Sequence, residues 1–346
     1  MTISSKRNTT FPEEIAKLDL NENPLGASPL AIAAGQQAML TCHRYPDTLG
    51  LSLKKTLSTH LDILIENIAL GNGSESLLEL IVKNTLGPLD SAVVPNFCFL
   101  GLLKILENAK VILKIADNSH LNISPIKLLE AVDPMTKILF LVNPNNPTGS
   151  YTNKSDLFFL LSHLPKKILV VIDEAYAEYV EASDYPNSLQ LLEKYPNLII
   201  LRTFSKIYGL AGLRLGYAIS TPEIITKLNN FSSLPFRINA VALATAETSL
   251  KDQEHIHLTR LLNRQGYLQI SQGLRDLGLE VLPSCTSFIC VNLKVPSWPI
   301  CQQLLLCGIY VRSLCDYGLP NFLRVSIGTE KQNLAFLNNL KKILLK

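Results

Sequence analysis

The stretch NLIILRTFSKIYGLAGLRLGY (197–217) starts as an apolar run and continues into a polar segment rich in glycine. Four other short apolar or β-branched runs precede it, at 91–94, 111–115, 137–142 and 168–172. Runs of this length and composition are typical of buried strands. Segments with the apolar spacing of helices occur among them, at 75–86, 99–108 and 154–163. This alternation predicts an α/β fold, with a mostly parallel sheet between helices.

The pattern changes past about residue 235. Longer helical segments are followed by runs that we interpret as strands of a separate small sheet, at 288–293, 309–314 and 322–327. Pro235, in SSLPFRIN (232–239), interrupts the helical pattern and marks the boundary. With 346 residues and 47% hydrophobic content, the chain also exceeds the size at which a single core normally keeps growing. We therefore expect two domains.

Composition argues against several classes of function. The net charge is only +3, from 32 basic and 29 acidic residues without long blocks of one sign, so we expect no nucleic-acid partner. The seven cysteines include no C-x-x-C pair, which favours free thiols over disulfides or a zinc site. The N-terminus has no apolar signal-like region, and no segment approaches the ~20 apolar residues of a membrane span. We expect a cytoplasmic protein without membrane partners.

Polar segments follow three of the predicted strands, and the carboxyl ends of parallel strands meet at one edge of a sheet. The first segment is NPNNPTG (143–149), whose prolines and glycine form either a ligand-binding turn with asparagine amides or an ordinary turn. The second is IDEAYAEY (172–179). Asp173 would be costly to bury without a cationic partner, unless it caps a helix. Tyr176 either presents its phenol to the same place or packs in the core.

The third polar segment is the one quoted first. Its Thr203, Ser205, Lys206 and Arg214 supply the hydroxyl donors and cations that suit a phosphate group. A further anion site is offered by GNGSES (71–76), where glycines allow close backbone approach and a helix N-terminus favours negative charge. This stretch lacks the full G-x-G-x-x-G spacing, which argues against a dinucleotide site.

Together the three segments offer a lysine amine, a carboxylate, an amide, a phenol and a phosphate-binding cluster. Pyridoxal 5'-phosphate requires this set, because it forms a Schiff base with a lysine and its pyridinium nitrogen needs an acidic partner. The sequence therefore predicts a pyridoxal-phosphate enzyme, and no metal.

Seven ordered motifs make the chain resemble the histidinol-phosphate aminotransferases, class II pyridoxal-phosphate-dependent enzymes of fold-type I. They are LNENPLG (20–26), YPD (45–47), GNGSESL (71–77), NPNNPTG (143–149), DEAYAEY (173–179), RTFSKIYGLAGLRLGY (202–217) and LRVSIGT (323–329). The resemblance runs from about residue 18 to 340. It implies a large domain with a mostly parallel seven-stranded sheet (41–235), a small α/β domain (236–346), and an N-terminal arm (1–40) that forms part of the small domain.

The resemblance also implies roles for single residues. Lys206 forms the Schiff base, Asp173 pairs with the pyridinium nitrogen, and Tyr176 is the third catalytic residue. Tyr176 and Asn146 hydrogen-bond the cofactor's phenolic oxygen, and Phe97 stacks on its ring. The other cofactor-binding residues surround the phosphate: Gly73, Ser74, Glu75, Thr203, Ser205 and Arg214. The expected substrate-binding residues are Asn23, Arg312 and Arg324.

Four departures from the family pattern lie where substrate choice is expected. Leu25 stands where many members have an aromatic residue that contacts the substrate phosphate. Ser233 and Arg237, in SLPFRIN, replace an arginine and an asparagine, and Ser287 replaces another asparagine. None of these positions belongs to the cofactor set.

The reaction implied by the resemblance converts L-histidinol phosphate and 2-oxoglutarate into 3-(imidazol-4-yl)-2-oxopropyl phosphate and L-glutamate, a step of histidine biosynthesis. Three alternatives stay open: an aminotransferase for aromatic or other amino acids in a specialised pathway, a threonine-phosphate decarboxylase, and a non-catalytic binding protein of the same fold. The resemblance further implies a homodimer in which the second subunit completes each active site.

Overall fold

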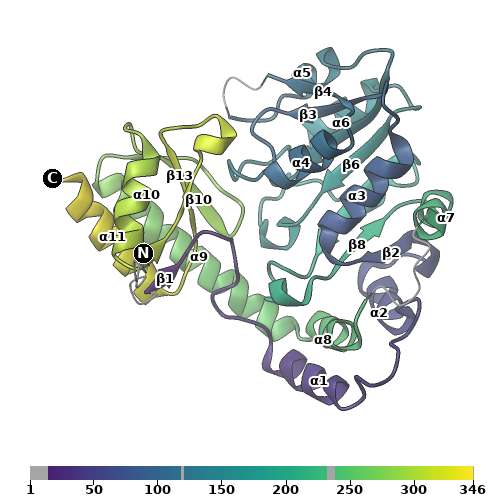
Figure 1. Cartoon of the computed structure of the whole chain (residues 1–346), viewed down its shortest axis with the longest axis horizontal. Helices are drawn as coiled ribbons and strands as arrows, with labels where there is room; N and C mark the ends of the chain where they lie inside the picture. Colours follow the sequence, from purple (N-terminus) through teal and green to yellow (C-terminus); the bar gives the residue numbers. More distant parts are fainter. Residues whose placement is uncertain (1–14, 118–120, 232–237, 346) are drawn as a thin grey trace, which may run out of the picture.

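A computed structural model describes residues 15–117, 121–231 and 238–345 of the chain. Its largest element is a seven-stranded sheet in the order β2-β8-β7-β6-β5-β3-β4 (Figure 1). The strands are β2 (Ile68–Gly71), β3 (Ser91–Pro95), β4 (Ile112–Ala116), β5 (Thr136–Val142), β6 (Leu169–Asp173), β7 (Leu198–Thr203) and β8 (Gly216–Ile219). The predicted α/β fold is confirmed, and all five runs predicted as strands belong to this sheet.

The direction of the strands changes at β8. The neighbouring strands from β4 to β7 run parallel, whereas β8 is antiparallel to both β7 and β2. The sequence did not predict β2 or β8, because IALG and GYAI are only four residues long and each has a glycine at one end. The reversal places the start of β8 beside the end of β7, at the carboxyl edge of the parallel strands.

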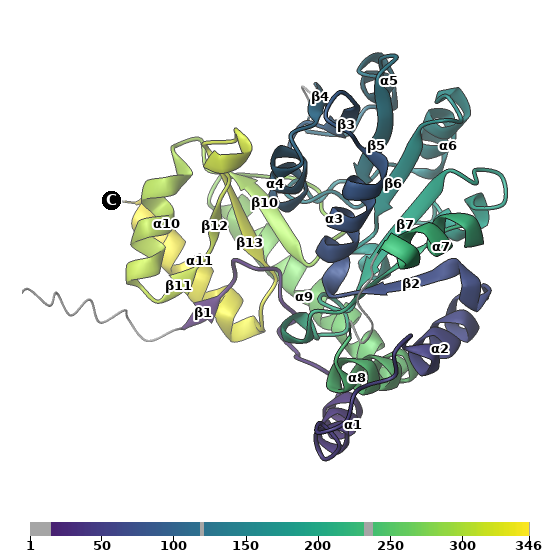
Figure 2. The same ribbon diagram turned by 45° about the vertical axis from the view of Figure 1, so that its right-hand side comes forward.

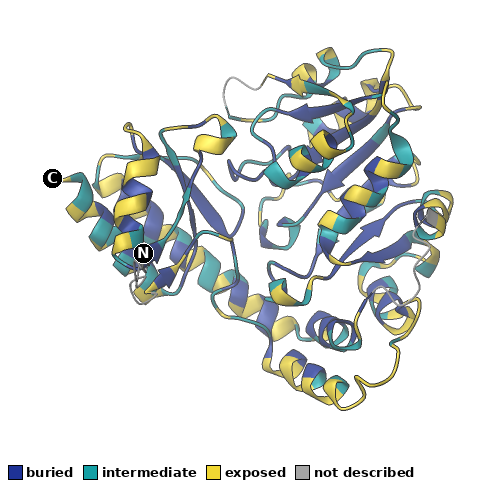
Figure 3. Ribbon diagram, viewed as in Figure 1, coloured by how far each residue is buried: buried dark blue, intermediate teal, exposed yellow. Residues whose placement is uncertain are grey.

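Both faces of the large sheet are buried, because successive side chains of each strand enter two different hydrophobic cores. In β7, Leu198 and Ile200 pack into one core while Ile199 and Leu201 pack into the other. The helices α3 (Gly73–Thr85), α4 (Leu100–Asn108) and α7 (Pro222–Phe231) contribute to the second core. The first core receives α2 (Leu51–Leu61), α5 (Pro125–Glu130), α6 (Lys154–His163) and α8 (Ala240–Lys251). Figure 3 shows the strands buried and the helices exposed along their outer sides.

A second, smaller body lies beside the large sheet (Figure 2). Its four-stranded antiparallel sheet has the order β12-β13-β10-β9. These strands are β9 (Glu280–Val281), β10 (Phe288–Asn292), β12 (Arg312–Ser313) and β13 (Phe322–Ser326). The helices of this part are α9 (Gln253–Asp276), α10 (Ser297–Leu306) and α11 (Glu330–Leu344). The single strand predicted at 309–314 is instead two strands, because β11 (Ile309–Tyr310) pairs with β1 (Ala16–Lys17) while β12 pairs with β13.

The N-terminal part of the chain bridges the two bodies. Ala16 and Leu18 are buried in the core of the smaller body, together with residues of β10, β13 and α11. The next helix, α1 (Pro29–Met39), packs instead against α8 of the larger body. Residues 19–28 therefore cross from one body to the other. The predicted boundary at 235 lies outside the described residues, so the domain limits stay a prediction.

Two features are absent from residues 15–117, 121–231 and 238–345. Within these ranges, no helix combines the length and the apolar character needed to cross a membrane. The same part of the chain holds no group of three or more His, Cys, Asp or Glu side chains placed to hold a metal ion.

Candidate active site

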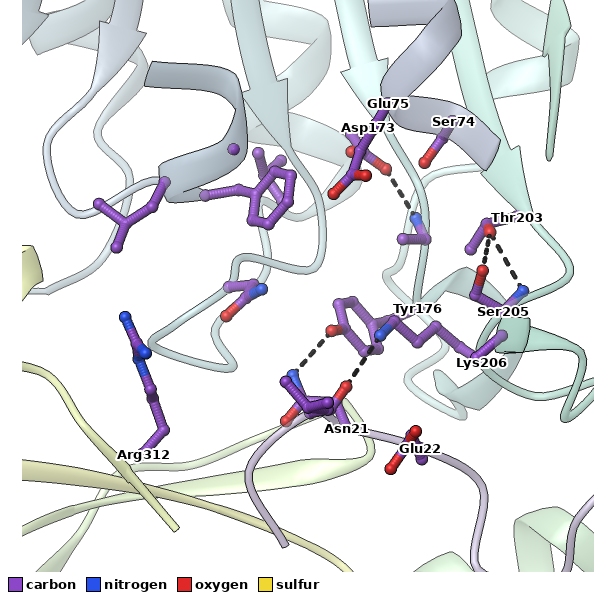
Figure 4. A pocket seen from close by; sticks show the side chains of 18 of the residues that line it. Asn21, Glu22, Ser74, Glu75, Asp173, Tyr176, Thr203, Ser205, Lys206 and Arg312 are labelled. Carbon is purple, nitrogen blue, oxygen red and sulfur yellow. Dashed lines mark hydrogen bonds between the residues drawn. The ribbon is translucent and has the colours of Figure 1, made fainter. Parts of the chain in front are cut away.

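A cavity of about 600 Å³ lies at the carboxyl ends of β5, β6 and β7 (Figure 4). The larger body contributes Asp173 and Lys206 to its lining, and the smaller body contributes Arg312 and Arg324. The crossing segment 19–22 also lines it. The cavity is thus built from three parts of the chain that are distant in sequence.

Lys206 lies in the tight turn after β7. Thr203 Oγ1 accepts a hydrogen bond from the Ser205 amide at 3.1 Å, and the Gly209 amide donates to the Lys206 carbonyl at 3.0 Å. Gly209 has φ +68°, and a Cβ there would lie 2.3 Å from the Gly26 carbonyl oxygen, so only glycine fits. The Lys206 Nζ donates to the Leu20 carbonyl at 3.2 Å. The amine therefore faces the cavity with no carboxylate bound to it among the described residues.

Asp173 ends β6 at the cavity wall and is 7% exposed. Its Oδ1 accepts a hydrogen bond from the Ala175 amide at 3.1 Å, but it forms no salt bridge within the described chain. Burial, reinforced by Glu174 and Glu75, raises the pKa of the Asp173 carboxyl to about 6. A buried carboxylate without a cationic partner is suited to a ligand that brings its own positive charge. The protonated ring nitrogen of pyridoxal phosphate is such a group.

A cluster of anion-binding groups adjoins Lys206. The N-terminus of α3 meets β8 closely there: a Cβ on Gly216 would lie 2.5 Å from the Ser74 amide nitrogen. Arg214 Nη2 contacts Glu75 Oε2 at 3.0 Å, and Nη1 lies 3.5 Å from Ser205 Oγ. Helix N-terminal amides, hydroxyls and a guanidinium at one place fit a phosphate group.

A substitution at Gly216 tests whether the cluster around the α3 N-terminus binds the cofactor phosphate. Gly216→Ala is expected to weaken pyridoxal-phosphate binding by about tenfold or more, because the new methyl group displaces the α3 N-terminus. Fluorescence titration of cofactor-free protein measures the dissociation constant. Gly212→Ala is the matched control, since its Cβ would have no neighbour within 4 Å although Gly212 also lines the cavity. Equal affinities for the two variants would contradict the proposed phosphate position.

The two arginines expected to bind substrate differ in their surroundings. Arg324, on β13, is 6% exposed; its Nη1 donates to Asn146 Oδ1 at 2.6 Å and its Nη2 to the Asp19 carbonyl at 2.6 Å. Its Nε has no hydrogen-bond partner among the described residues. Arg312, on β12, is more exposed and forms an ion pair with Asp316 at 2.9 Å. Arg324 is thus held rigidly at the cavity wall, while Arg312 has a partner that a ligand anion can replace.

Most of the predicted site residues come together in this cavity. Those that line it are Ser74, Glu75, Asn146, Asp173, Tyr176, Thr203, Ser205, Lys206, Arg214, Arg312 and Arg324. Gly73 does not line it but has φ +78°, and a Cβ there would lie 2.8 Å from Arg214 Nη2. Gly73 therefore serves the cluster by its small size.

Two predicted residues lie elsewhere. The Asn23 side chain donates to the Ile207 carbonyl at 2.9 Å and accepts from the Leu25 amide at 3.0 Å, so its amide fixes the crossing segment and does not line the cavity. Phe97 packs against Leu314 and its neighbours in the smaller body, and the aromatic ring that lines the cavity beside it in sequence is Phe99. Asn23 and Phe97 therefore do not line the cavity in this structure, and the substrate and cofactor contacts expected of them stay predictions.

Some lining residues were not predicted. They are Asp19, Leu20, Asn21, Glu22, Phe99, Lys104, Tyr317 and several others. Asn21 belongs to the motif LNENPLG, which could have marked it as a site residue. Nothing in the sequence distinguished Lys104 from an ordinary charged residue on a helix surface. Among the departures from the family pattern, Leu25 does not line the cavity and Ser287 is buried. Ser233 and Arg237 lie outside the described residues.

A doubly covered α/β sheet with a lysine, a buried aspartate and a phosphate cluster at its carboxyl edge defines a class of transferase. The chain belongs to the class I and II aminotransferase family, whose model matches residues 13–340. It is 42% identical to histidinol-phosphate aminotransferase 2 of Pseudomonas fluorescens, over 96% of this chain and 90% of that protein.

Solved structures agree with this membership. Histidinol-phosphate aminotransferase from Sinorhizobium meliloti, solved in complex with pyridoxal-5'-phosphate, superposes with a TM-score of 0.91 at 27% identity and covers 96% of this chain and 92% of that one. L-threonine-O-3-phosphate decarboxylase from Porphyromonas gingivalis has the same fold, with a TM-score of 0.84 at 20% identity over 96% of this chain and 100% of that one. The fold alone therefore does not separate the two activities.

Proposed function

We propose that the protein is a pyridoxal-phosphate-dependent aminotransferase that acts on L-histidinol phosphate and 2-oxoglutarate in histidine biosynthesis. The observation that carries the proposal is the buried Asp173, which has no salt bridge among the described residues and lies in the same cavity as Lys206 and the phosphate-binding cluster. The choice of amino donor is supported by the names of the relatives, among them the 42% identical protein of Pseudomonas fluorescens.

The residues that would hold the cofactor fit three of its parts, namely the ring nitrogen, the phosphate and the aldehyde carbon. Asp173 would pair with the ring nitrogen, and Arg214, Ser205 and the α3 N-terminus would bind the phosphate. Lys206 Nζ would hold the cofactor covalently and, when the substrate amine replaces it, accept the proton from the substrate's α-carbon. When bound, pyridoxal phosphate supplies an electron sink that makes this C–H bond acidic.

Arg312 and Arg324 would bind the anionic end of each substrate in turn. Both line the cavity from strands of the smaller body. An aminotransferase must accept a phosphate in one half-reaction and carboxylates in the other, and the planar guanidinium fork suits both. Lys104 adds a third positive charge to the same cavity and forms no hydrogen bond or ion pair with the described residues. These three cations favour an amino donor that carries a dianion.

A homodimer is part of the proposal. The segment between Leu25 and Leu51 exposes a series of large apolar side chains, which a monomer would leave in water. They include Leu30 (62%), Met39 (56%), Leu40 (71%), Tyr45 (84%) and Leu49 (60%). We expect a second copy of the chain to bury this segment. Sedimentation equilibrium, which gives the molar mass in solution, tests whether the protein is a dimer. We place the dimer in the cytoplasm.

A spectral screen of amines tests the choice of substrate. Mixing the cofactor-loaded protein with histidinol phosphate is expected to remove the cofactor's visible absorption, and 2-oxoglutarate is expected to restore it. The same screen includes aromatic amino acids and threonine phosphate. A response to another amine alone would contradict the assignment to histidinol phosphate, and release of carbon dioxide from threonine phosphate would identify the protein as the decarboxylase.

A further inference from the structure

Asn21 is a cavity residue with an unusual backbone. It lies in the crossing segment, is 2% exposed, and has φ +57°, a left-handed conformation that asparagine tolerates better than most residues. Its backbone amide donates to Ser326 Oγ at 2.8 Å. The residue is thus fixed by contact with β13, which is far away in the sequence.

Only one assignment of donors and acceptors fits the hydrogen bonds around Asn21. Because Ser326 Oγ accepts from the Asn21 backbone, its own hydrogen is donated to Asn21 Oδ1, at 3.0 Å. This contact fixes the orientation of the side-chain amide, so Nδ2 points to the Tyr176 hydroxyl oxygen at 2.9 Å (Figure 4). An amide nitrogen can only donate, and the Tyr176 oxygen must therefore accept.

The Tyr176 hydroxyl hydrogen is consequently directed away from Asn21. Within residues 15–117, 121–231 and 238–345, no acceptor receives it, and Tyr176 lines the cavity. The ring itself is held by an edge-to-face contact with Phe288, with ring centroids 5.3 Å apart. The phenol is therefore fixed in place and its hydrogen is available to a ligand in the cavity.

We propose that Asn21 is a positioning residue, which makes Tyr176 a hydrogen-bond donor to the ionised ring oxygen of the cofactor. A tyrosine hydroxyl on its own can rotate and either donate or accept. The hydrogen bonds from Ser326 to Asn21 and from Asn21 to Tyr176 fix the Tyr176 hydroxyl as a donor before the cofactor binds. The inference rests on the proposed function, because it needs pyridoxal phosphate in this cavity.

The same strand reaches the second expected partner of the ring oxygen. Arg324 and Ser326 are two residues apart on β13 and therefore point to the same side of the strand. Arg324 contacts Asn146 Oδ1, and Ser326 contacts Asn21. Both Asn146 and Tyr176 are thus oriented from β13, the strand that also carries an arginine expected to bind substrate.

The pH dependence of the cofactor's visible absorption tests the inference without an activity assay. A donor stabilises the ionised ring oxygen and so lowers the midpoint of this titration. Tyr176→Phe is expected to raise the midpoint by about one pH unit or more, the size expected for a hydrogen bond to a charged group. Asn21→Gly, which keeps the left-handed backbone but removes the amide, is expected to raise it by about half a unit or more.

The double variant decides whether the two residues act together. The protein with both Asn21→Gly and Tyr176→Phe is expected to have the midpoint of Tyr176→Phe alone. Once the Tyr176 hydroxyl is gone, removal of the Asn21 amide has no further effect on the ring oxygen. Additive shifts, or an unchanged midpoint in Asn21→Gly, would overturn the inference. Ser326→Ala is a second route to the same effect should Asn21→Gly fail to fold, and it is expected to raise the midpoint as well. A wild-type protein with no visible band would instead reject the proposed function itself.

Discussion

Lys206→Ala is expected to abolish the visible absorption band of the cofactor-loaded protein and to lower kcat by about 10³-fold or more. The lysine supplies both the covalent bond to the cofactor and the base for the α-proton, and alanine can do neither. The Lys206 amine donates to the Leu20 carbonyl at 3.2 Å, and the other lysine that lines the cavity, Lys104, lies on a different element, α4.

Lys104→Ala is the matched control for this experiment. Lys104 is the other lysine that lines the cavity, but it lies on α4, on the surface of the larger body. The Lys104→Ala protein is expected to keep the visible band. Absorption spectra of both variants after loading and gel filtration give the comparison, and a persistent band in Lys206→Ala would refute the assignment of the Schiff-base lysine.

Asp173→Asn is expected to lower kcat by about 10²- to 10³-fold, the usual cost of removing one well-placed electrostatic partner at a reacting group. Asparagine keeps the oxygen that accepts from the Ala175 amide but loses the negative charge that would hold the ring nitrogen protonated. Stopped-flow measurement of the decay of the visible band with amine gives the rate directly. A rate close to that of the wild type would exclude an ion pair between Asp173 and the cofactor.

The same substitution is expected to stabilise the cofactor-free protein. The carboxyl pKa is raised from 3.8 to about 6 in the folded chain, so folding favours the protonated form. The wild type therefore loses up to about 3 kcal/mol of unfolding free energy as the pH rises from about 4 to about 6, and this loss persists above pH 6. An asparagine side chain does not titrate, so the variant has no such dependence. Urea unfolding of cofactor-free protein should show Asp173→Asn as the more stable form at pH 8, with the difference vanishing near pH 4.

The sequence predicted the parts of the fold that have strong local signals. The apolar runs of β3, β5, β6 and β7 are continuous, because parallel strands covered on both faces carry no polar alternation. The short strands β2 and β8 have no such run, and their place in the sheet depends on pairing with each other and with β7. The antiparallel edge of the sheet, formed by β2 and β8, could therefore be identified only from the structure.

The candidate site was predictable where a side chain's role depends on its own chemistry. Asp173 ends β6, Lys206 follows β7 and Arg214 precedes β8, and all three line the cavity. Phe97 and Phe99 are two residues apart in PNFCF, and their identity alone could not indicate which ring faces the cavity. Asn21 depends on Ser326, a contact across 305 residues, so no local pattern could reveal the direction of its hydrogen bonds.

The cavity divides its tasks between the two bodies that it joins. Asp173 and Lys206 come from the large sheet, whereas Arg312 and Arg324 come from two strands of the small one. On the roles proposed above, sequence change in β12 would alter which amine is accepted without changing Asp173 or Lys206. On the proposed roles, β12 is the part of the smaller body that can change with the substrate, whereas β13 is constrained because it also orients Asn146 and Tyr176.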